Sequence, residues 1–207
     1  LSAILDVGIL AVFIIFQPEI RGLLYRIGQN PSIRLFGGKS STEQVIDEVI
    51  NAVKHMSTEY IGALIVFAPP SGALNYDNTG TQLDSVVKQK LLVSIFRKES
   101  PLHDGAVIIR NNRITAAGCF LSLSENPNLS KSLGTRHRAA IGMSENNNMF
   151  VIVVSEETGR ISVAQNGNLI SGLSIQRLRK EMESSFSLTK FKEEVAFSAP
   201  QTEMNLK

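Results

Sequence analysis

The chain has 207 residues, of which 43% are hydrophobic and 19% are charged, and its formal net charge is +2 at pH 7. This composition excludes a disordered tail, a collagen-like chain and a disulfide-stapled scaffold. The length fits one domain of roughly 150 residues plus an additional segment. The pI of 8.8 is too mild for a nucleic-acid binder, so we expect no nucleic-acid partner. The single cysteine, Cys119, lies in an apolar run and is expected to be a packed thiol in a reducing compartment.

The additional segment lies at the N-terminus. Residues 1–16 are apolar except for Asp6, whereas a full bilayer crossing needs about 20 apolar residues. The segment that follows is basic, as expected on the cytoplasmic side of a membrane, because it contains Arg21, Arg26, Arg34 and Lys39. We therefore interpret residues 1–20 as the C-terminal part of a transmembrane helix and residues 21–41 as a juxtamembrane linker. A buried core helix with a solvated basic end is the alternative.

Residues 42–186 are predicted to form one α/β unit that opens with an amphipathic helix. Apolar residues recur at helical spacing up to about Glu59, and Ser41 followed by Gln44 predicts a capping box. Residues 61–68 are a nearly continuous apolar run, which is typical of a strand buried on both faces. A polar turn over residues 76–80 follows this strand.

The middle of the unit is predicted to hold a second helix and a hairpin. Asp84 or Ser85 can cap the helix, whose apolar residues again recur at helical spacing. Residues 106–110 and 113–123 are predicted to be two strands joined by an Asn-Asn turn, since asparagine tolerates positive φ.

The last predicted elements complete a mixed sheet. Residues 149–154 and 160–165 are predicted strands, Asn166-Gly167 is a turn, and a helix covers residues 174–186. Because strands and helices interleave, we expect an α/β fold with a mixed central β-sheet flanked by helices. Residues 187–207 form a weakly patterned C-terminal tail.

Three polar clusters fall where a loop or a strand end meets the predicted sheet, which is where α/β proteins bind ligands. The first cluster is His103-Asp104-Gly105-Ala106. Asp104 can hold a divalent metal or accept a proton from a hydroxyl, and His103 can add a nitrogen ligand. Gly105 lets a ligand approach the backbone closely. The alternative interpretation is a turn in which Asp104 bonds local amides.

The second cluster is GTRHR at residues 134–138, which leads into a predicted helix that ends at Met143. A helix N-terminus offers free amides and partial positive charge, so with Thr135 and Arg136 it suits a polyphosphate. Arg136 and Arg138 diverge by about 200° on a helix. We therefore expect Arg136 to bind phosphate. Arg138 is expected either to contact the ligand or to support the site. A solvated basic first turn is the alternative.

The third cluster is Ser155-Glu156-Glu157-Thr158-Gly159, directly after an apolar strand. Two adjacent carboxylates at a strand end allow one to face a ligand with a metal while the other faces solvent. An acidic turn between two strands is the alternative.

In combination, PLHDGAVII, GTRHRAAIG and VSEETG resemble the diadenylate cyclase (DAC) family, which is marked by a DGA and an RHR motif. The resemblance covers about residues 61–186. FQPEIR at residues 16–21 and the apolar front resemble the membrane-anchored CdaA type, in which three transmembrane helices precede the cyclase domain. The resemblance implies the DAC-domain fold over residues 42–186. It also implies a bacterial cell-membrane protein whose catalytic domain lies in the cytoplasm.

The resemblance further implies metal-dependent synthesis of cyclic di-AMP from two ATP, with release of two pyrophosphates. The ion would be Mn2+ or Mg2+, with Co2+ as a further candidate. By likeness to the family motifs, the catalytic residues would be Asp104, Gly105, Arg136, His137 and Arg138. The ATP-binding residues would be Ala106, Phe120, Thr135 and Ser155. The metal ligands would be Asp104, His103 and Glu157.

The implied reaction needs two copies of the chain. Each ATP is both attacker and target, so two subunits must bring their nucleotides face to face across a two-fold axis. The family also implies membrane attachment through N-terminal helices, and a YbbR-domain regulator and phosphoglucosamine mutase as partners. A membrane-tethered adenine-nucleotide sensor without catalysis and a nucleotidyltransferase with another product remain as alternatives. Residues 68–83 depart from the common family pattern, so the resemblance does not assign the adenine-pocket residues in that segment.

Overall fold

The computed structural model describes residues 40–70, 78–127, 129–130, 133–146 and 149–198. Contacts divide the chain into residues 1–43 and residues 44–207, and the sheet belongs to the second unit. Its strands have the order β2-β4-β3-β1-β5-β6-β7. In chain order the strands are β1 Ala63–Phe67, β2 Thr81–Val86, β3 Ala106–Arg110, β4 Arg113–Cys119, β5 Phe150–Val154, β6 Ile161–Gln165 and β7 Asn168–Ser171. The helices are α3 Ser41–Thr58, α4 Gln89–Phe96, α5 Thr135–Asn146 and α6 Ile175–Ser198.

The sheet is mixed, as the interleaved sequence pattern predicts. Strands β1 and β3 are parallel, whereas β1 and β5 pair antiparallel, as do the remaining neighbours. All residues of the central strands β1 and β5 are buried, which explains their continuous apolar runs. Both outermost strands, β2 and β7, are largely exposed.

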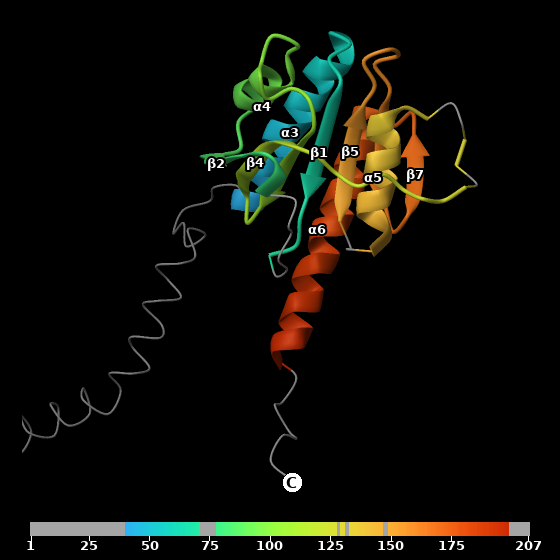
Figure 1. The fold of residues 1–207 in the computed structure, drawn as a ribbon. Helices are drawn as coiled ribbons and strands as arrows, with labels where there is room; N and C mark the ends of the chain where they lie inside the picture. The colour runs from blue at the N-terminus through green and yellow to red at the C-terminus, as the bar shows by residue number, and fades with distance from the viewer. Residues whose placement is uncertain (1–39, 71–77, 128, 131–132, 147–148, 199–207) are drawn as a thin grey trace, which may run out of the picture. The chain divides into compact units, whose positions relative to one another are not determined.

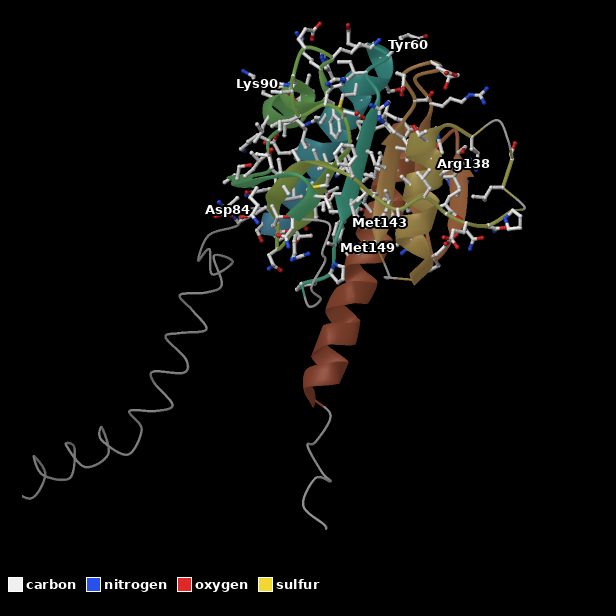
Figure 2. The ribbon with its side chains drawn as sticks, viewed as in Figure 1. Tyr60, Asp84, Lys90, Arg138, Met143 and Met149 are labelled. Atoms are coloured by element: carbon white, nitrogen blue, oxygen red, sulfur yellow. The ribbon has the colours of Figure 1, made fainter. Side chains whose placement is uncertain are left out.

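Helices cover both faces of the sheet (Figure 1). Side chains of α3, α4 and α6 pack in one apolar cluster with Ile65 and Ile152 of the central strands. On the opposite face, α5 packs in a second cluster with Leu64 and Val66. Met143 of α5 lies near Met149 in this second cluster (Figure 2). Successive residues of β1 therefore enter different clusters, in keeping with the two-residue period of a strand.

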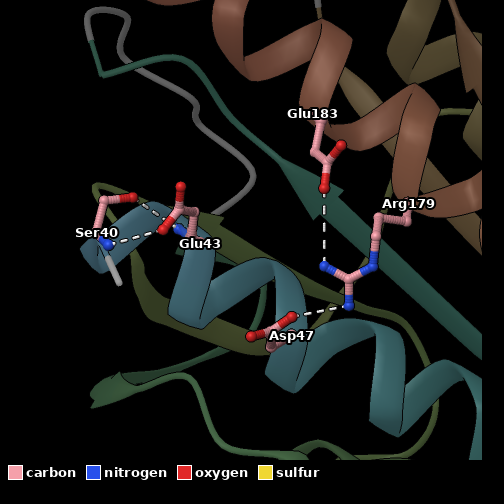
Figure 3. Close-up of polar contacts among 5 residues, drawn as sticks. All are labelled: Ser40, Glu43, Asp47, Arg179 and Glu183. Carbon is pink, nitrogen blue, oxygen red and sulfur yellow. Dashed lines mark hydrogen bonds and ion pairs between the residues drawn. The ribbon is translucent and has the colours of Figure 1, made fainter. Parts of the chain in front are cut away.

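Helix α3 begins with a capping box one position earlier than Ser41 and Gln44 predict (Figure 3). The Ser40 N–H donates to Glu43 Oε2 over 2.9 Å, and the Glu43 N–H donates to Ser40 Oγ over 3.1 Å. The sequence SSTEQ offers both pairs, and the pair that contains a carboxylate forms because negative charge is favoured at a helix N-terminus. The helix begins at Ser41, and residues 21–39 of the predicted linker lie outside the described residues, so the linker stays a prediction.

Helix α6 is tied to α3 by an arginine (Figure 3). Arg179 Nη2 lies 2.8 Å from Asp47 Oδ1 on α3, and Arg179 Nη1 lies 3.7 Å from Glu183 Oε1 one turn along α6. The Arg179 side chain is 40% exposed, so each contact contributes at most about 1 kcal/mol. Helix α6 extends to Ser198, beyond the predicted helix end at residue 186.

The predicted helix cap at Asp84 or Ser85 is wrong because these residues belong to the edge strand β2. Asp84 has φ 45° at an irregularity in the pairing with β4, and its Oδ1 accepts from Arg113 Nε over 2.6 Å. Helix α4 begins at Gln89 instead, and Lys88 provides no side-chain cap. The Gln89 N–H donates over 2.8 Å to Oε2 of Glu48 on α3. A cap supplied by another helix leaves no local sequence signal.

The hairpin turn is confirmed, since Asn111 and Asn112 have φ 51° and 62°. Strand β4 ends at Cys119 rather than at residue 123, and the thiol of Cys119 is buried, as expected. The chain then runs against α5, where a Cβ on Gly142 would lie 2.8 Å from the Ser122 carbonyl oxygen. Helix α5 is longer than predicted and ends at Asn146.

The predicted transmembrane segment over residues 1–20 lies outside the described residues. Within the described ranges, no helix combines the length and the apolar character that a bilayer crossing requires. The membrane anchor therefore stays a prediction from the sequence.

Candidate functional site

The sheet topology brings all three polar clusters to one edge of the sheet, namely the end at which β1 and β3 begin and β5 ends. Ile65 of β1 is paired with Val107 of β3, and Ala63 is paired with Val154 of β5. Extending both registers places Gly62, the residue before β1, between Asp104 on one side and Ser155 on the other. Neighbouring strands are about 4.8 Å apart, so the backbones of Asp104 and Ser155 are separated by roughly 10 Å. The N-terminal end of β1, which follows Tyr60 in Figure 2, marks this edge.

Helix α5 adds its first turn to the same edge. Arg136 Nη1 lies 2.7 Å from Oε1 of Glu156, in the turn that follows β5. The Arg136 side chain is 22% exposed and that of Glu156 is 45% exposed. A Cβ on Gly62 would lie 2.6 Å from Arg136 Nη1 and closer still to Glu156 Oε2. The ion pair therefore packs directly over the backbone at the start of β1.

The turn after β5 is ordered by its own hydrogen bonds. The Ser155 N–H donates to the Arg160 carbonyl over 3.0 Å, and Ser155 Oγ accepts from the Thr158 N–H over 3.3 Å. The turn is also fixed to α3, because Ser57 Oγ donates to the Gly159 carbonyl over 2.5 Å. Ser155 Oγ keeps its own O–H to donate to a ligand. Glu157 is exposed, whereas Glu156 is the carboxylate that faces Arg136.

His137 is turned toward β6. Its Nε2 lies 3.4 Å from Ser162 Oγ, and that hydroxyl donates to Ser171 Oγ over 3.1 Å. Burial lowers the pKa of His137, and the opposing effect of the Glu156 carboxylate is smaller. His137 is therefore neutral at pH 7 and offers a hydrogen bond rather than a positive charge. Its predicted contact with phosphate stays a prediction.

The loop before β3 presents Asp104 to solvent. His103 Nδ1 lies 2.7 Å from the Ser100 carbonyl oxygen, so Nδ1 carries the proton and Nε2 remains an acceptor. Gly105 has φ 116°, and a Cβ there would lie 2.7 Å from the Gly118 carbonyl carbon. The glycine of this motif is thus required by the packing of the loop against β4, independently of any ligand. Ala106 is fully buried at the start of β3.

Phe120 provides an uncovered aromatic ring at the end of β4. Its side chain is 65% exposed, although its backbone is fixed by Thr79, whose Oγ1 accepts from the Phe120 N–H over 3.1 Å. The pairing of Ala106 with Cys119 places Phe120 beside the backbone of Gly105. An exposed ring next to the loop of Asp104 suits stacking with a nucleobase. Residues 71–77, within the segment that departs from the family pattern, lie outside the described residues.

The two arginines of the second cluster differ in their described contacts. Arg136 faces Glu156, whereas Arg138 takes no part in that ion pair. The Arg138 N–H donates to the Gly134 carbonyl over 3.2 Å, and its own carbonyl accepts from the Ser124 N–H over 3.1 Å. Thr135 is exposed at the first position of α5. The first turn of α5, together with Arg136, stays the predicted anion site.

The predicted metal ligands do not form a cage. Among the residues that the structure describes, no three His, Cys, Asp or Glu side chains are grouped closely enough to hold a metal ion. Asp104 and Glu157 are both exposed carboxylates, the ligand type that Mg2+ uses together with substrate phosphates, so they stay the predicted metal ligands. The hydrogen bond of His103 uses Nδ1, so the lone pair of its Nε2 can ligate a metal.

A hollow of about 740 Å³ lies elsewhere, on the side of α3 and α4. Its lining includes His55, Gln89 and Arg97, and none of the predicted site residues. The candidate site is thus an open sheet edge rather than this hollow.

The sequence prediction gave no role to Gly62 or Glu156, and its assignment of Glu157 to a metal stays a prediction. A glycine immediately before a buried strand is a sign of close approach by another group, and this signal was present in IGALIVFA. No local signal distinguishes two adjacent glutamates in a turn. Ser162, the partner of His137, is likewise visible only after the sheet is built.

Comparison with known proteins identifies the domain. The model of the DAC family, described as "DisA bacterial checkpoint controller nucleotide-binding", matches residues 50–169. The chain is 44% identical over 181 residues to the cyclic di-AMP synthase CdaA of Bacillus subtilis, covering 86% of this chain and 66% of that protein. It is 44% identical over 175 residues to a diadenylate cyclase of Listeria monocytogenes, covering 84% of this chain and 64% of that protein. The chain thus spans slightly less than two thirds of these relatives.

Two solved structures share the fold. The crystal structure of a double cysteine mutant of DacA from Staphylococcus aureus has a TM-score of 0.67 and 45% sequence identity, covering 69% of this chain and 95% of that one. A protein from Bacillus cereus described as a hypothetical membrane spanning protein has a TM-score of 0.58 and 34% identity, covering 78% of this chain and 80% of that one. Both agree with the sheet and helices described above.

Proposed function

The chain belongs to the DAC family, and we propose that it condenses two ATP molecules into cyclic di-AMP with release of two pyrophosphates. One observation carries the proposal, which is the convergence at one sheet edge of an exposed acid, an anion-binding helix end and an uncovered ring. These are Asp104, the first turn of α5 with Arg136, and Phe120. The curated relatives named as cyclic di-AMP synthase and diadenylate cyclase support the same activity.

Each half of the reaction is a displacement at phosphorus. The 3′-oxygen of one ATP forms a bond to the α-phosphorus of the other, and the bond from that phosphorus to its pyrophosphate oxygen breaks. Asp104 accepts the proton of the 3′-hydroxyl or orients that hydroxyl. Arg136 and the free amides of α5 offset the charge that develops on the leaving pyrophosphate. The same step repeated with the roles exchanged closes the ring.

The remaining site residues bind and orient the nucleotide. Phe120 stacks on adenine, and Gly105 and Ala106 let the nucleotide lie against the start of β3. Thr135 and Ser155 donate hydroxyl hydrogen bonds to phosphate, and neutral His137 adds a hydrogen bond supported by Ser162. A bound Mn2+, Mg2+ or Co2+ ion would offset phosphate charge, and Asp104, Glu157 and His103 are the residues to hold it.

A homodimer is part of the proposal because one chain presents one such edge. Two edges that face each other across a two-fold axis bring each 3′-hydroxyl to the other nucleotide's α-phosphorus. The catalytic rate per subunit is then expected to fall on dilution below the dimer dissociation constant. A rate per subunit that stays constant over that range would remove the dimer from the mechanism.

We further propose a location at the bacterial cell membrane, with the catalytic domain in the cytoplasm. The likeness to CdaA and to the membrane spanning protein of Bacillus cereus supports attachment through N-terminal helices. The family resemblance adds a YbbR-domain regulator and phosphoglucosamine mutase as partners. Co-purification of either protein with the full-length chain from membranes is the direct test.

The deciding experiment is incubation with ATP and Mn2+, followed by identification of products by mass. Asp104→Asn is expected to retain ATP binding and to lose cyclic di-AMP, because the substitution removes the proton acceptor and leaves the phosphate contacts in place. Binding without product in the wild-type chain would support a nucleotide sensor instead. A product of different mass would indicate another nucleotidyltransferase, and an active Asp104→Asn variant would exclude Asp104 from catalysis.

A further inference from the structure

The Arg136–Glu156 ion pair, together with Gly62 beneath it, is a feature that the proposed mechanism does not explain. Its two side chains come from the first turn of α5 and from the turn after β5, and they meet over the start of β1. A side chain at Gly62 would occupy the space that the two charged groups use. The missing Cβ therefore creates the room in which the pair forms.

We propose that Glu156 is a positioning residue that fixes the Arg136 guanidinium against the backbone of Gly62, in the orientation that receives a nucleotide phosphate. This inference rests on the proposed function, because it assigns the use of Arg136 to phosphate binding. It adds two residues, Glu156 and Gly62, to which the motif resemblance gives no role.

The geometry indicates that Glu156 supports Arg136 and does not compete with phosphate for its guanidinium. A guanidinium has five N–H donors in a rigid planar fork, and the 2.7 Å contact with Glu156 is made by Nη1. The remaining donors can hold a phosphate while the ion pair persists. Arg136 is a long side chain that loses rotamer entropy on binding, so fixing it before the ligand arrives reduces the cost of binding.

The alternative is that Glu156 occupies the place of phosphate and must be displaced. The two ideas predict opposite signs for one measurement. Removing the charge of a supporting carboxylate weakens nucleotide binding, whereas removing a competing carboxylate strengthens it. The test is therefore the affinity of ATP for Glu156→Gln, measured by calorimetry in EDTA so that metal ligands do not contribute.

We expect Glu156→Gln to weaken ATP binding about 5- to 10-fold, part of the loss that follows when a charge-assisted hydrogen bond is removed entirely. Glu59→Gln is the matched control, because Glu59 is an exposed carboxylate three residues before Gly62 and forms no ion pair among the described residues. This control removes the same charge and is expected to leave ATP affinity unchanged or slightly higher. Equal or tighter binding by Glu156→Gln would overturn the proposal.

A double-mutant cycle separates positioning from general disturbance. In an Arg136→Ala background, Glu156→Gln is expected to change ATP affinity less than two-fold, because there is no guanidinium left to orient. With Mn2+ present, Glu156→Gln should raise the KM for ATP more than it lowers kcat. An undiminished effect of Glu156→Gln without Arg136 would show that Glu156 acts by another route.

Gly62→Ala provides a second, independent variant. The atoms that its Cβ would meet are the ends of two flexible side chains, so the pair can move while the fold is kept. We expect weaker ATP binding with a urea midpoint close to that of the wild type, and unchanged ATP binding would contradict the role of Gly62. These measurements need no product, so a wild-type chain that bound ATP without making cyclic di-AMP would refute the proposed function alone.

Discussion

Replacing Gly105 by alanine tests whether the DGA glycine has a structural role of its own. Its φ of 116° lies outside the regions that L-residues populate. The added Cβ would also lie 2.7 Å from the Gly118 carbonyl carbon and 2.8 Å and 2.9 Å from the Cys119 carbonyl oxygen and nitrogen. All three atoms are backbone of β4, so no side-chain rotation can relieve the collision.

The expected cost has two parts. Forcing alanine into such a φ costs about 1–3 kcal/mol. Overpacking against a fixed neighbour typically costs about 1–3 kcal/mol more, because backbone atoms must shift. The free energy of unfolding should therefore fall by about 2–6 kcal/mol, which is a large fraction of the stability of an ordinary domain.

Urea unfolding of Gly105→Ala and of Gly172→Ala separates the two parts. Gly172 also has positive φ, 75°, but a Cβ there would meet no atom within 4 Å. It therefore reports the cost of backbone conformation without the collision. We expect Gly105→Ala to lower the midpoint substantially more than Gly172→Ala. Equal midpoints for the two variants would refute the argument that β4 excludes a side chain at residue 105.

Two titrating groups give further predictions for stability. Burial lowers the pKa of His137 in the folded chain, so the unfolded chain binds the proton more tightly. The free energy of unfolding therefore falls as the pH decreases below 6.5, the ordinary pKa of histidine. The urea midpoint of His137→Gln should vary less with pH than that of the wild type over this range. Hydrogen bonds from Lys88 and the Gln89 N–H lower the pKa of Glu48, so its contribution is present above 4.5 and is lost as pH falls through the lowered value. Glu48→Ala should cost about 1 kcal/mol at pH 7 by removing the α4 cap, and an unchanged midpoint would contradict that.

The elements that sequence predicts well are those whose signal is local and whose burial is complete. Strands β1 and β5 are buried along their whole length, so their apolar runs are unbroken. The Asn111-Asn112 turn is specified by residues that tolerate positive φ. The helical period of α3 is long enough to set its extent to within a residue at either end.

The elements that sequence misplaces depend on distant partners. Strand β2 has little apolar pattern because it lies at the sheet edge, and its Asp84 looks like a helix cap while it pairs with Arg113. The real cap of α4 comes from Glu48, 41 residues earlier. The last turn of α5 offers its Ser144 carbonyl to the Gly167 N–H, a contact that exists only once β6 and β7 have formed.

The same distinction between local signals and distant partners applies to the residues of the candidate site. The sequence predicts roles for residues within the motifs because their types and spacing carry chemistry. Gly62 and Glu156 act through a contact between three separate elements, and the choice between Glu156 and Glu157 depends on the geometry of the turn after β5. Motif residues are thus accessible to sequence reasoning, whereas the residues that position them require the fold.

The exposure of the site residues supports the proposed homodimer. Asp104 and Phe120 are both exposed at the sheet edge. In the proposed mechanism a single chain supplies one acid, one anion site and one stacking ring. A ring-closing reaction between two nucleotides needs two such sets and the exclusion of water between them. Apposition of two edges supplies both, so the exposed residues are expected to become protected together when ATP and a second copy are bound.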